Sequence, residues 1–298
     1  MIIGFIGIGN MGLPMAMNML KAGYEIVVSS ALGNQVPARE LEESGAKVVA
    51  TIREVIECAE TLVTVLPADK QILAVYLGRD GVLEHIKSGA VCIEMTSSKG
   101  ETIKTVEQEA KKQGKNISFI DSPVSGGVDA AKAGTLTIMA AGRKEIVDEY
   151  MPLLETVGKK IFYTGEELGS AKSIKMLNQL LNAGNTCVAS EVLYLAQQLG
   201  VDMDTFCSIV NESSGASWVF KNNVPKFVLP MNFDGGFKLE LMKKDVGLAI
   251  EQTFTENISL PLMNMVYQVL TSEANLGHGT KNYNIVSDWI KRQNGSFN

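Results

Sequence analysis

Apolar positions follow one pattern in the first half of the chain and another in the second. Up to about residue 163, short continuous apolar runs alternate with helical segments, as buried parallel strands and their crossover helices do. The predicted strands are 2–6, 24–28, 62–66, 90–95, 117–120, 135–140 and 160–163. Beyond that point the patterns are helical, over 203–211, 218–229, 238–255, 260–274 and 285–291. We therefore predict an α/β, doubly wound domain (1–163) followed by an all-α domain (164–298).

The longest helical pattern, about residues 168–199, opens the second domain and is expected to join it to the first. No proline interrupts this segment, and its apolar residues cover a broad surface. Lys175, Asn178, Gln179 and Asn182 are spaced so that they share one face of the helix. This polar stripe is either the wall of a polar pocket or a solvated face. Its low charge favours the pocket.

A glycine motif connects the first predicted strand to the first helix. A strand before the motif, a helix after it and a second strand beyond form the context of a dinucleotide-binding site. Its glycines permit a tight turn, the approach of backbone to a pyrophosphate and close packing of helix on strand. We expect the cofactor on Gly7, Ile8, Gly9, Asn10, Met11 and Gly12. The domain is therefore predicted to be of Rossmann type.

The end of the second strand gives information on the choice of cofactor. An acidic residue there would bind the ribose of NAD, whereas this chain has Ser29 and Ser30. The two hydroxyls either bind the additional phosphate of NADP or belong to a solvated loop. We expect NADP or NAD, with a slight preference for NADP.

Other candidates lie where later strands end, the edge at which open parallel sheets bind ligands. Leu66, Pro67 and Thr96 are candidate contacts to the ribose and nicotinamide, with ordinary loop and cap chemistry as the alternative. The segment Ser125, Gly126 and Gly127 exposes several backbone N–H groups. Such a segment either binds an anion, for instance a substrate carboxylate, or forms a plain turn.

Composition excludes several other classes of protein. The 298 residues carry a net charge of −6 without a basic block, so a nucleic-acid partner is not expected. No apolar run approaches the roughly 20 residues of a membrane span, and the N-terminus does not resemble a signal peptide. The four dispersed cysteines suggest reduced thiols, so we expect a cytoplasmic protein. With two histidines, a Ser-His-Asp hydrolase or a zinc site is not predicted, and we expect no metal.

Lys175 is the candidate for acid–base chemistry. Reduction of a carbonyl by hydride requires a proton for the new alkoxide. Lys175 either supplies this proton or remains cationic and stabilises the oxyanion, while Asn178 and Gln179 hold the substrate or orient the ammonium. Lys172, three residues earlier, is the second candidate.

With these motifs, the chain resembles the β-hydroxyacid dehydrogenases. This family includes 3-hydroxyisobutyrate dehydrogenase and tartronate semialdehyde reductase and, more distantly, 6-phosphogluconate dehydrogenase. The resemblance extends over nearly the whole chain. The segments that carry it are GFIGIGNMGLPMAMNML (4–20), VLP (65–67), EMTSS (94–98), DSPVSGG (121–127), GSAKSIKMLNQ (169–179) and GFKLELMKKD (236–245).

The resemblance implies NAD(P)-dependent interconversion of a small β-hydroxy acid and its semialdehyde, in a homodimer or homotetramer. It places the catalytic lysine on Lys175, together with Asn178, and a second lysine near the nicotinamide on Lys244. It also implies that Ser125, Gly126 and Gly127 hold the substrate carboxylate. The alternatives are an imine reductase-like enzyme and a dinucleotide-binding protein without catalysis.

Overall fold

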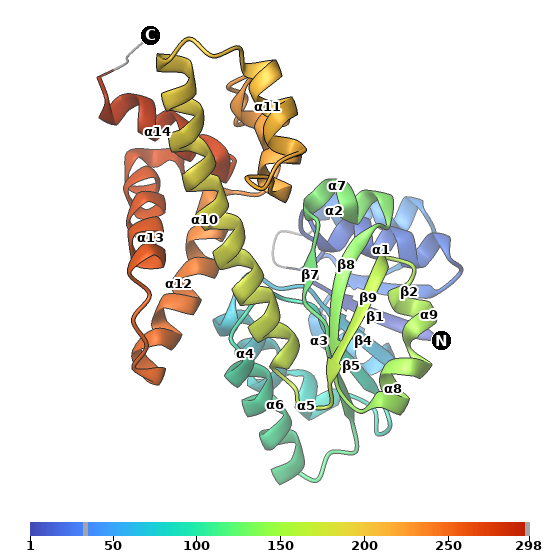
Figure 1. Ribbon diagram of the computed structural model, residues 1–298. Coiled ribbons are helices and arrows are strands. Elements are labelled where there is room, and N and C mark those ends of the chain that lie inside the picture. The colour runs from blue at the N-terminus through green and yellow to red at the C-terminus, as the bar shows by residue number, and fades with distance from the viewer. Residues whose placement is uncertain (32–34, 296–298) are drawn as a thin grey trace. The chain divides into compact units, whose positions relative to one another are not determined.

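The computed structural model describes residues 1–31 and 35–295 (Figure 1). The chain forms two compact units, Met1–Lys175 and Met176–Asn298, and the boundary between them falls inside one continuous helix, α10 (Ser170–Gln198). Each unit is described by itself below. Among the described residues, no helix is both long and apolar enough to cross a membrane.

The first unit is built on a sheet of nine strands in the order β3-β2-β1-β4-β5-β6-β8-β7, with β9 beside β8. From β1 to β6 all neighbouring strands are parallel, whereas β8 runs antiparallel to β6 and β7. The predicted strands are confirmed, and two short ones, β3 and β7, are additional. The strands are β1 (Ile2–Ile6), β2 (Glu25–Ser29), β3 (Lys47–Val49), β4 (Thr61–Thr64), β5 (Val91–Glu94), β6 (Ser118–Asp121), β7 (Val124–Ser125), β8 (Leu136–Ala141) and β9 (Gly158–Gly165).

Two apolar clusters lie on opposite faces of this sheet, because successive strand residues point to opposite sides. Leu62 belongs to the cluster that contains residues of α3 to α6, and Val63 belongs to the cluster that contains residues of α1, α2, α7 and α9. The predicted doubly wound Rossmann-like architecture is thereby confirmed. The helices are α1 (Gly12–Lys21), α2 (Gln35–Glu43), α3 (Ile52–Cys58), α4 (Asp69–Leu77), α5 (Val82–His85), α6 (Gly100–Lys112), α7 (Gly127–Ala133), α8 (Lys144–Glu149) and α9 (Met151–Leu154).

The second unit is helical, as predicted, and its main core joins α10, α12 and α13. One predicted helix differs in type, because residues 219–228 form a π-helix, η1, that contains Pro225. The elements that follow α10 are α11 (Met203–Asn211), η1 (Val219–Val228), α12 (Leu239–Glu256), α13 (Pro261–Glu273), η2 (Ala274–His278), η3 (Tyr283–Ile285) and α14 (Val286–Gln293).

Candidate active site

The glycine motif forms a turn that only glycines permit at two of its positions. A Cβ on Gly7, which has a φ of +101°, would lie 2.0 Å from the carbonyl oxygen of Val65, and one on Gly12 would lie 1.9 Å from that of Gly7. Around Gly9, by contrast, a Cβ would meet no atom within 4 Å. The turn leads directly into α1, whose N-terminus has no side-chain cap. This open backbone beside a helix N-terminus fits a dinucleotide pyrophosphate.

Ser29, at the end of β2, uses its hydroxyl within the protein. Its Oγ accepts a hydrogen bond from the N–H of Ala31 at 3.0 Å and donates one to the carbonyl of Ala50 at 3.3 Å. The side chain is buried, whereas that of Ser30 is half-buried. Residues 32–34, which follow in the sequence, lie outside the described residues.

Hydrogen bonds join the glycine turn to the ends of β4 and β5. The N–H of Val65 donates to the carbonyl of Ile6 at 3.0 Å, and the N–H of Leu66 donates to Oγ1 of Thr96 at 2.8 Å. Pro67 follows directly. The structure therefore brings the candidates Gly7, Leu66 and Thr96 to one edge of the sheet.

The start of α10 is attached to the same edge through a buried lysine. Lys172 Nζ donates hydrogen bonds to the carboxylate of Glu94 and, at 2.8 Å, to the carbonyl of Thr96. It also lies 3.1 Å from Oδ1 of Asp121. The other oxygen of Asp121, Oδ2, accepts the N–H of Gly169 at 2.9 Å. The side chains of Glu94, Lys172 and Asp121, which we call the buried triad, are fully inaccessible to solvent.

The pKa values of two members of the buried triad are shifted from their ordinary values. Burial by itself lowers the pKa of Lys172, but the nearby carboxylates of Asp121 and Glu94 outweigh this effect, and the net change is upward. Burial raises the pKa of Glu94, although Lys172 opposes the change. Lys172 therefore remains a firmly held ammonium, which is unsuited to exchanging a proton with a substrate near neutral pH.

The segment Ser125, Gly126 and Gly127 forms the turn between β7 and α7. Ser125 pairs with Thr137 of β8, and the glycines have φ values of +137° and +71°. A Cβ on Gly126 would lie 2.6 Å from that of Ala130, whereas one on Gly127 would meet nothing within 4 Å. Side chains are therefore disfavoured at both positions, and the backbone next to Gly127 is open.

Two of the four residues of the polar stripe of α10 are buried. Lys175 is 6% exposed and Gln179 is 4% exposed, so a fully solvated face is excluded, although Asn178 is exposed. Within the second unit, Nε2 of Gln179 donates to Oδ2 of Asp245 at 2.8 Å. Nζ of Lys244 lies 3.1 Å from Oδ1 of the same carboxylate. Gln179 and Lys244 are thus linked through Asp245, which is 3% exposed.

Three buried acids that bind the candidate residues, Glu94, Asp121 and Asp245, were not among the residues predicted for the site. The first two did leave a signal in the sequence, because each is a carboxylate that directly follows apolar residues at the end of a strand. Buried carboxylates need a partner of opposite charge or several hydrogen-bond donors. The partner Lys172 lies 78 residues after Glu94, a separation at which sequence spacing carries no information.

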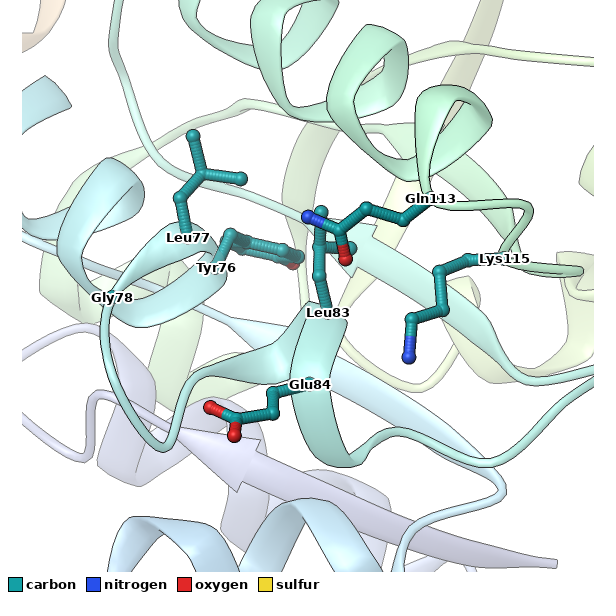
Figure 2. A pocket seen from close by; sticks show the side chains of 7 residues that line it. All are labelled: Tyr76, Leu77, Gly78, Leu83, Glu84, Gln113 and Lys115. Atoms are coloured by element: carbon teal, nitrogen blue, oxygen red, sulfur yellow. The ribbon is translucent and has the colours of Figure 1, made fainter.

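A cavity of about 310 Å³ in the first unit is not part of this arrangement (Figure 2). The end of α4, α5 and the segment after α6 line it with Tyr76, Leu77, Gly78, Leu83, Glu84, Gln113 and Lys115. The opposite end of α6, Gly100, contacts Gly169 at the start of α10. The cavity lies at the other end of this helix, and none of the three residues of the buried triad is among those that line it.

Comparison with known proteins identifies relatives over the full length. Residues 2–165 match the family described as the NAD binding domain of 6-phosphogluconate dehydrogenase. Residues 169–288 match the family described as NAD-binding of NADP-dependent 3-hydroxyisobutyrate dehydrogenase. The chain is 34% identical over 285 residues to 2-(hydroxymethyl)glutarate dehydrogenase of Eubacterium barkeri, covering 95% of this chain and 93% of the relative.

Two further relatives agree with these matches. Mitochondrial 3-hydroxyisobutyrate dehydrogenase of Mus musculus is 32% identical over 297 residues, covering 98% of this chain and 87% of the relative. The solved structure of Mycobacterium tuberculosis 3-hydroxyisobutyrate dehydrogenase with L-serine superimposes with a TM-score of 0.88 at 25% identity. That alignment covers 97% of this chain and 99% of the other.

Proposed function

The chain belongs to the β-hydroxyacid dehydrogenase family as an NAD(P)-dependent hydroxyacid dehydrogenase, and on this premise we propose that Lys175 is its general acid and base. The contrast between two lysines of one helix carries this proposal. Lys172 is enclosed in the buried triad, whereas Lys175 shares the polar stripe of α10 with Asn178 and Gln179. Lys172, the second candidate, is thereby assigned a different role.

The proposed reaction divides the work between cofactor and protein. A bound nicotinamide supplies or accepts the hydride. In reduction, the Lys175 ammonium donates a proton to the alkoxide oxygen, and in oxidation the neutral amine removes the proton from the hydroxyl. Asn178 and Gln179 orient the substrate oxygen and the ammonium.

We assign the dinucleotide to the glycine turn and to the strand ends joined to it. Gly9 supplies the open backbone for the pyrophosphate, next to Ile8, Asn10, Met11 and the start of α1. Leu66, Pro67 and Thr96 contact the ribose and nicotinamide side, and Lys244 contributes a further positive charge. Because the hydroxyl of Ser29 is already bonded to Ala31 and Ala50, Ser30 is the better of the two serines for a phosphate of NADP. The slight preference for NADP rests on this serine and on the lack of an acid at the end of β2.

The proposed substrate is a small carboxylate with a hydroxymethyl group on the carbon next to the carboxyl carbon. The compounds in the names of the relatives, 2-(hydroxymethyl)glutarate, 3-hydroxyisobutyrate and L-serine, all contain this unit and differ in the second substituent of that carbon. Ser125 and the backbone of Gly126 and Gly127 would bind the shared carboxylate, since two successive glycines with positive φ expose adjacent N–H groups.

We also propose that the protein is a homodimer or homotetramer. Five large apolar side chains of α10 and that of Leu199 directly after it are between 42% and 70% exposed, and they recur every three to seven residues. They are Leu177, Leu181, Val188, Val192, Leu195 and Leu199. An exposed apolar stripe of this length is typical of a helix that packs against a partner. Light scattering should report a dimer or tetramer, and a Leu181→Glu/Val188→Glu variant should shift it toward the monomer.

The test of the function is turnover of reduced nicotinamide, followed by absorbance, with NADH or NADPH and a panel of small semialdehydes and cyclic imines. We expect turnover of a semialdehyde and a loss of at least about 10²-fold in kcat for Lys175→Ala, with dinucleotide affinity unchanged. Lys104, exposed and paired with Glu167, provides the matched control Lys104→Ala. A Lys175→Ala variant with most of its turnover would contradict the assignment. Turnover of imines alone would indicate an imine reductase. Tight dinucleotide binding without any turnover would indicate a non-catalytic protein.

A further inference from the structure

The buried triad places three charges in the interior of the first unit, and stability does not explain this arrangement. Removing charges from water is costly, and apolar residues of similar volume often stabilise a protein as well or better. Glu94, Lys172 and Asp121 are nevertheless all fully buried in direct contact. Such a group instead fixes the relative orientation of the segments that carry it, because its hydrogen bonds and ion pairs are satisfied only in one geometry.

The contacts of the triad connect three segments that are distant in the sequence. Lys172 binds the end of β5 through Glu94 and the Thr96 carbonyl, and the end of β6 through Asp121. The second oxygen of each carboxylate accepts a hydrogen bond from a backbone N–H. The N–H of Thr96 donates to Glu94 at 3.1 Å, and the N–H of Gly169 donates to Asp121 at 2.9 Å. The start of α10 is therefore held by both a side chain and a backbone group.

A tight backbone contact prevents this helix start from sliding. A Cβ on Gly169, whose φ is +90°, would lie 2.9 Å from the Cα of Gly100. A Cβ on Gly100 would lie 3.1 Å from the Cα of Gly169. The close approach sets the distance of the helix start from α6, while Lys172 sets the rotation of α10 about its axis.

Lys175 follows Lys172 by three residues, which is roughly 4.5 Å along the axis and on a neighbouring part of the same face. A rotation by one residue would turn this face away by roughly 100°. We infer that Lys172, held by Glu94 and Asp121, is a positioning residue that fixes the orientation of Lys175 for proton transfer. The inference rests on the proposed role of Lys175.

The test removes the charges without changing the shape of the side chains. The variant Glu94→Gln/Lys172→Met/Asp121→Asn should remain folded and bind dinucleotide within about threefold of the native affinity. Its kcat should fall by at least about tenfold, with a smaller change in KM, and its solvent deuterium isotope effect on kcat should rise. A role limited to stability would leave kcat and the isotope effect unchanged.

A second experiment measures whether the effect of the triple variant on kcat depends on Lys175. If the triad acts through Lys175, the loss of kcat caused by the triple variant should disappear in a Lys175→Ala background. Equal losses in both backgrounds, or an unchanged kcat in the triple variant, would overturn the inference. Should the triple variant not fold, the single change Glu94→Gln carries the same test. Lys175→Ala alone tests the proposed function, so the two can fail separately.

Discussion

The backbone N–H of Leu66 donates a hydrogen bond to Oγ1 of Thr96 over 2.8 Å, and this bond ties the residues after β4 to those after β5. Thr96→Val keeps the shape of the side chain but removes the acceptor. We expect the free energy of unfolding to fall by about 1 kcal/mol and the KM for the dinucleotide to rise. Urea denaturation and a cofactor titration measure the two effects. Thr96→Ser, which retains the hydroxyl, is the matched control, and equal behaviour of the valine and serine variants would argue against the role of this bond.

The glycines of the dinucleotide turn should separate folding from cofactor binding. Gly9→Ala adds a methyl group where no protein atom lies within 4 Å, so the melting temperature should stay nearly unchanged. The same methyl group would meet the pyrophosphate, and we expect dinucleotide affinity to fall by at least about tenfold. Gly12→Ala places its Cβ 1.9 Å from the Gly7 carbonyl oxygen and should instead destabilise the protein. Calorimetry with and without dinucleotide distinguishes these outcomes, and wild-type affinity in Gly9→Ala would contradict the placement of the pyrophosphate.

In the second unit, the bond between Gln179 and Asp245 provides a test of the buried polar face. Asp245→Leu leaves the amide of Gln179 without its buried acceptor, which should cost about 2 kcal/mol in the free energy of unfolding. In Gln179→Leu/Asp245→Leu both partners are apolar, so much of this loss should be regained. Chemical denaturation of the two variants measures the difference. Equal stabilities of the single and double variants would show that the bond contributes little.

The elements predicted from the sequence are those in which a local pattern decides the structure. Continuous apolar runs produced the parallel strands, and the helical pattern without proline corresponds to the 29 residues of α10. The glycine turn was predictable because steric demands at Gly7 and Gly12 leave few alternatives. By contrast, β3 and β7 have three and two residues, too few for any period to appear.

The features that were not predicted depend on contacts between distant residues. Pairing of Lys172 with Glu94 spans 78 residues, so the sequence alone left Lys172 as a rival of Lys175. Residues 219–228 show apolar spacing that suits an α-helix, but the structure has a π-helix there. Pro225 lacks the N–H that a regular helix needs, which gives a physical reason for the irregular turn.

The thiols of Cys92 and Cys187 should not react in the folded protein. Burial raises the pKa of each to about 12, so the thiolate fraction at pH 8 is on the order of 10⁻⁴. A thiol reagent at pH 8 should therefore modify at most the two half-buried residues, Cys58 and Cys207, in the native protein. In denaturant all four cysteines should react. Mass spectrometry of the labelled peptides identifies the sites, and rapid native labelling of Cys92 would contradict its burial in the sheet.

Alkaline unfolding should report on the charge of Lys172. The pKa of Lys172 is raised in the folded protein, because Asp121 and Glu94 outweigh the effect of burial. The folded state therefore binds this proton more tightly than the unfolded chain, whose lysine titrates near about 10.4. The resulting stabilisation is fully present below that pH and is lost as the pH rises through the folded pKa.

We expect the urea midpoint of the wild type to fall as the pH rises above about 10.4, the ordinary pKa of lysine. The matched control is Glu94→Gln/Lys172→Met/Asp121→Asn, in which residue 172 has no proton to lose. Buried tyrosines such as Tyr76, whose pKa burial raises well above its ordinary value, also make the folded state less stable as the pH rises. Since both proteins contain these tyrosines, the difference between the two curves isolates the triad. Curves that run parallel over this range would show that Lys172 titrates alike in the folded and unfolded states.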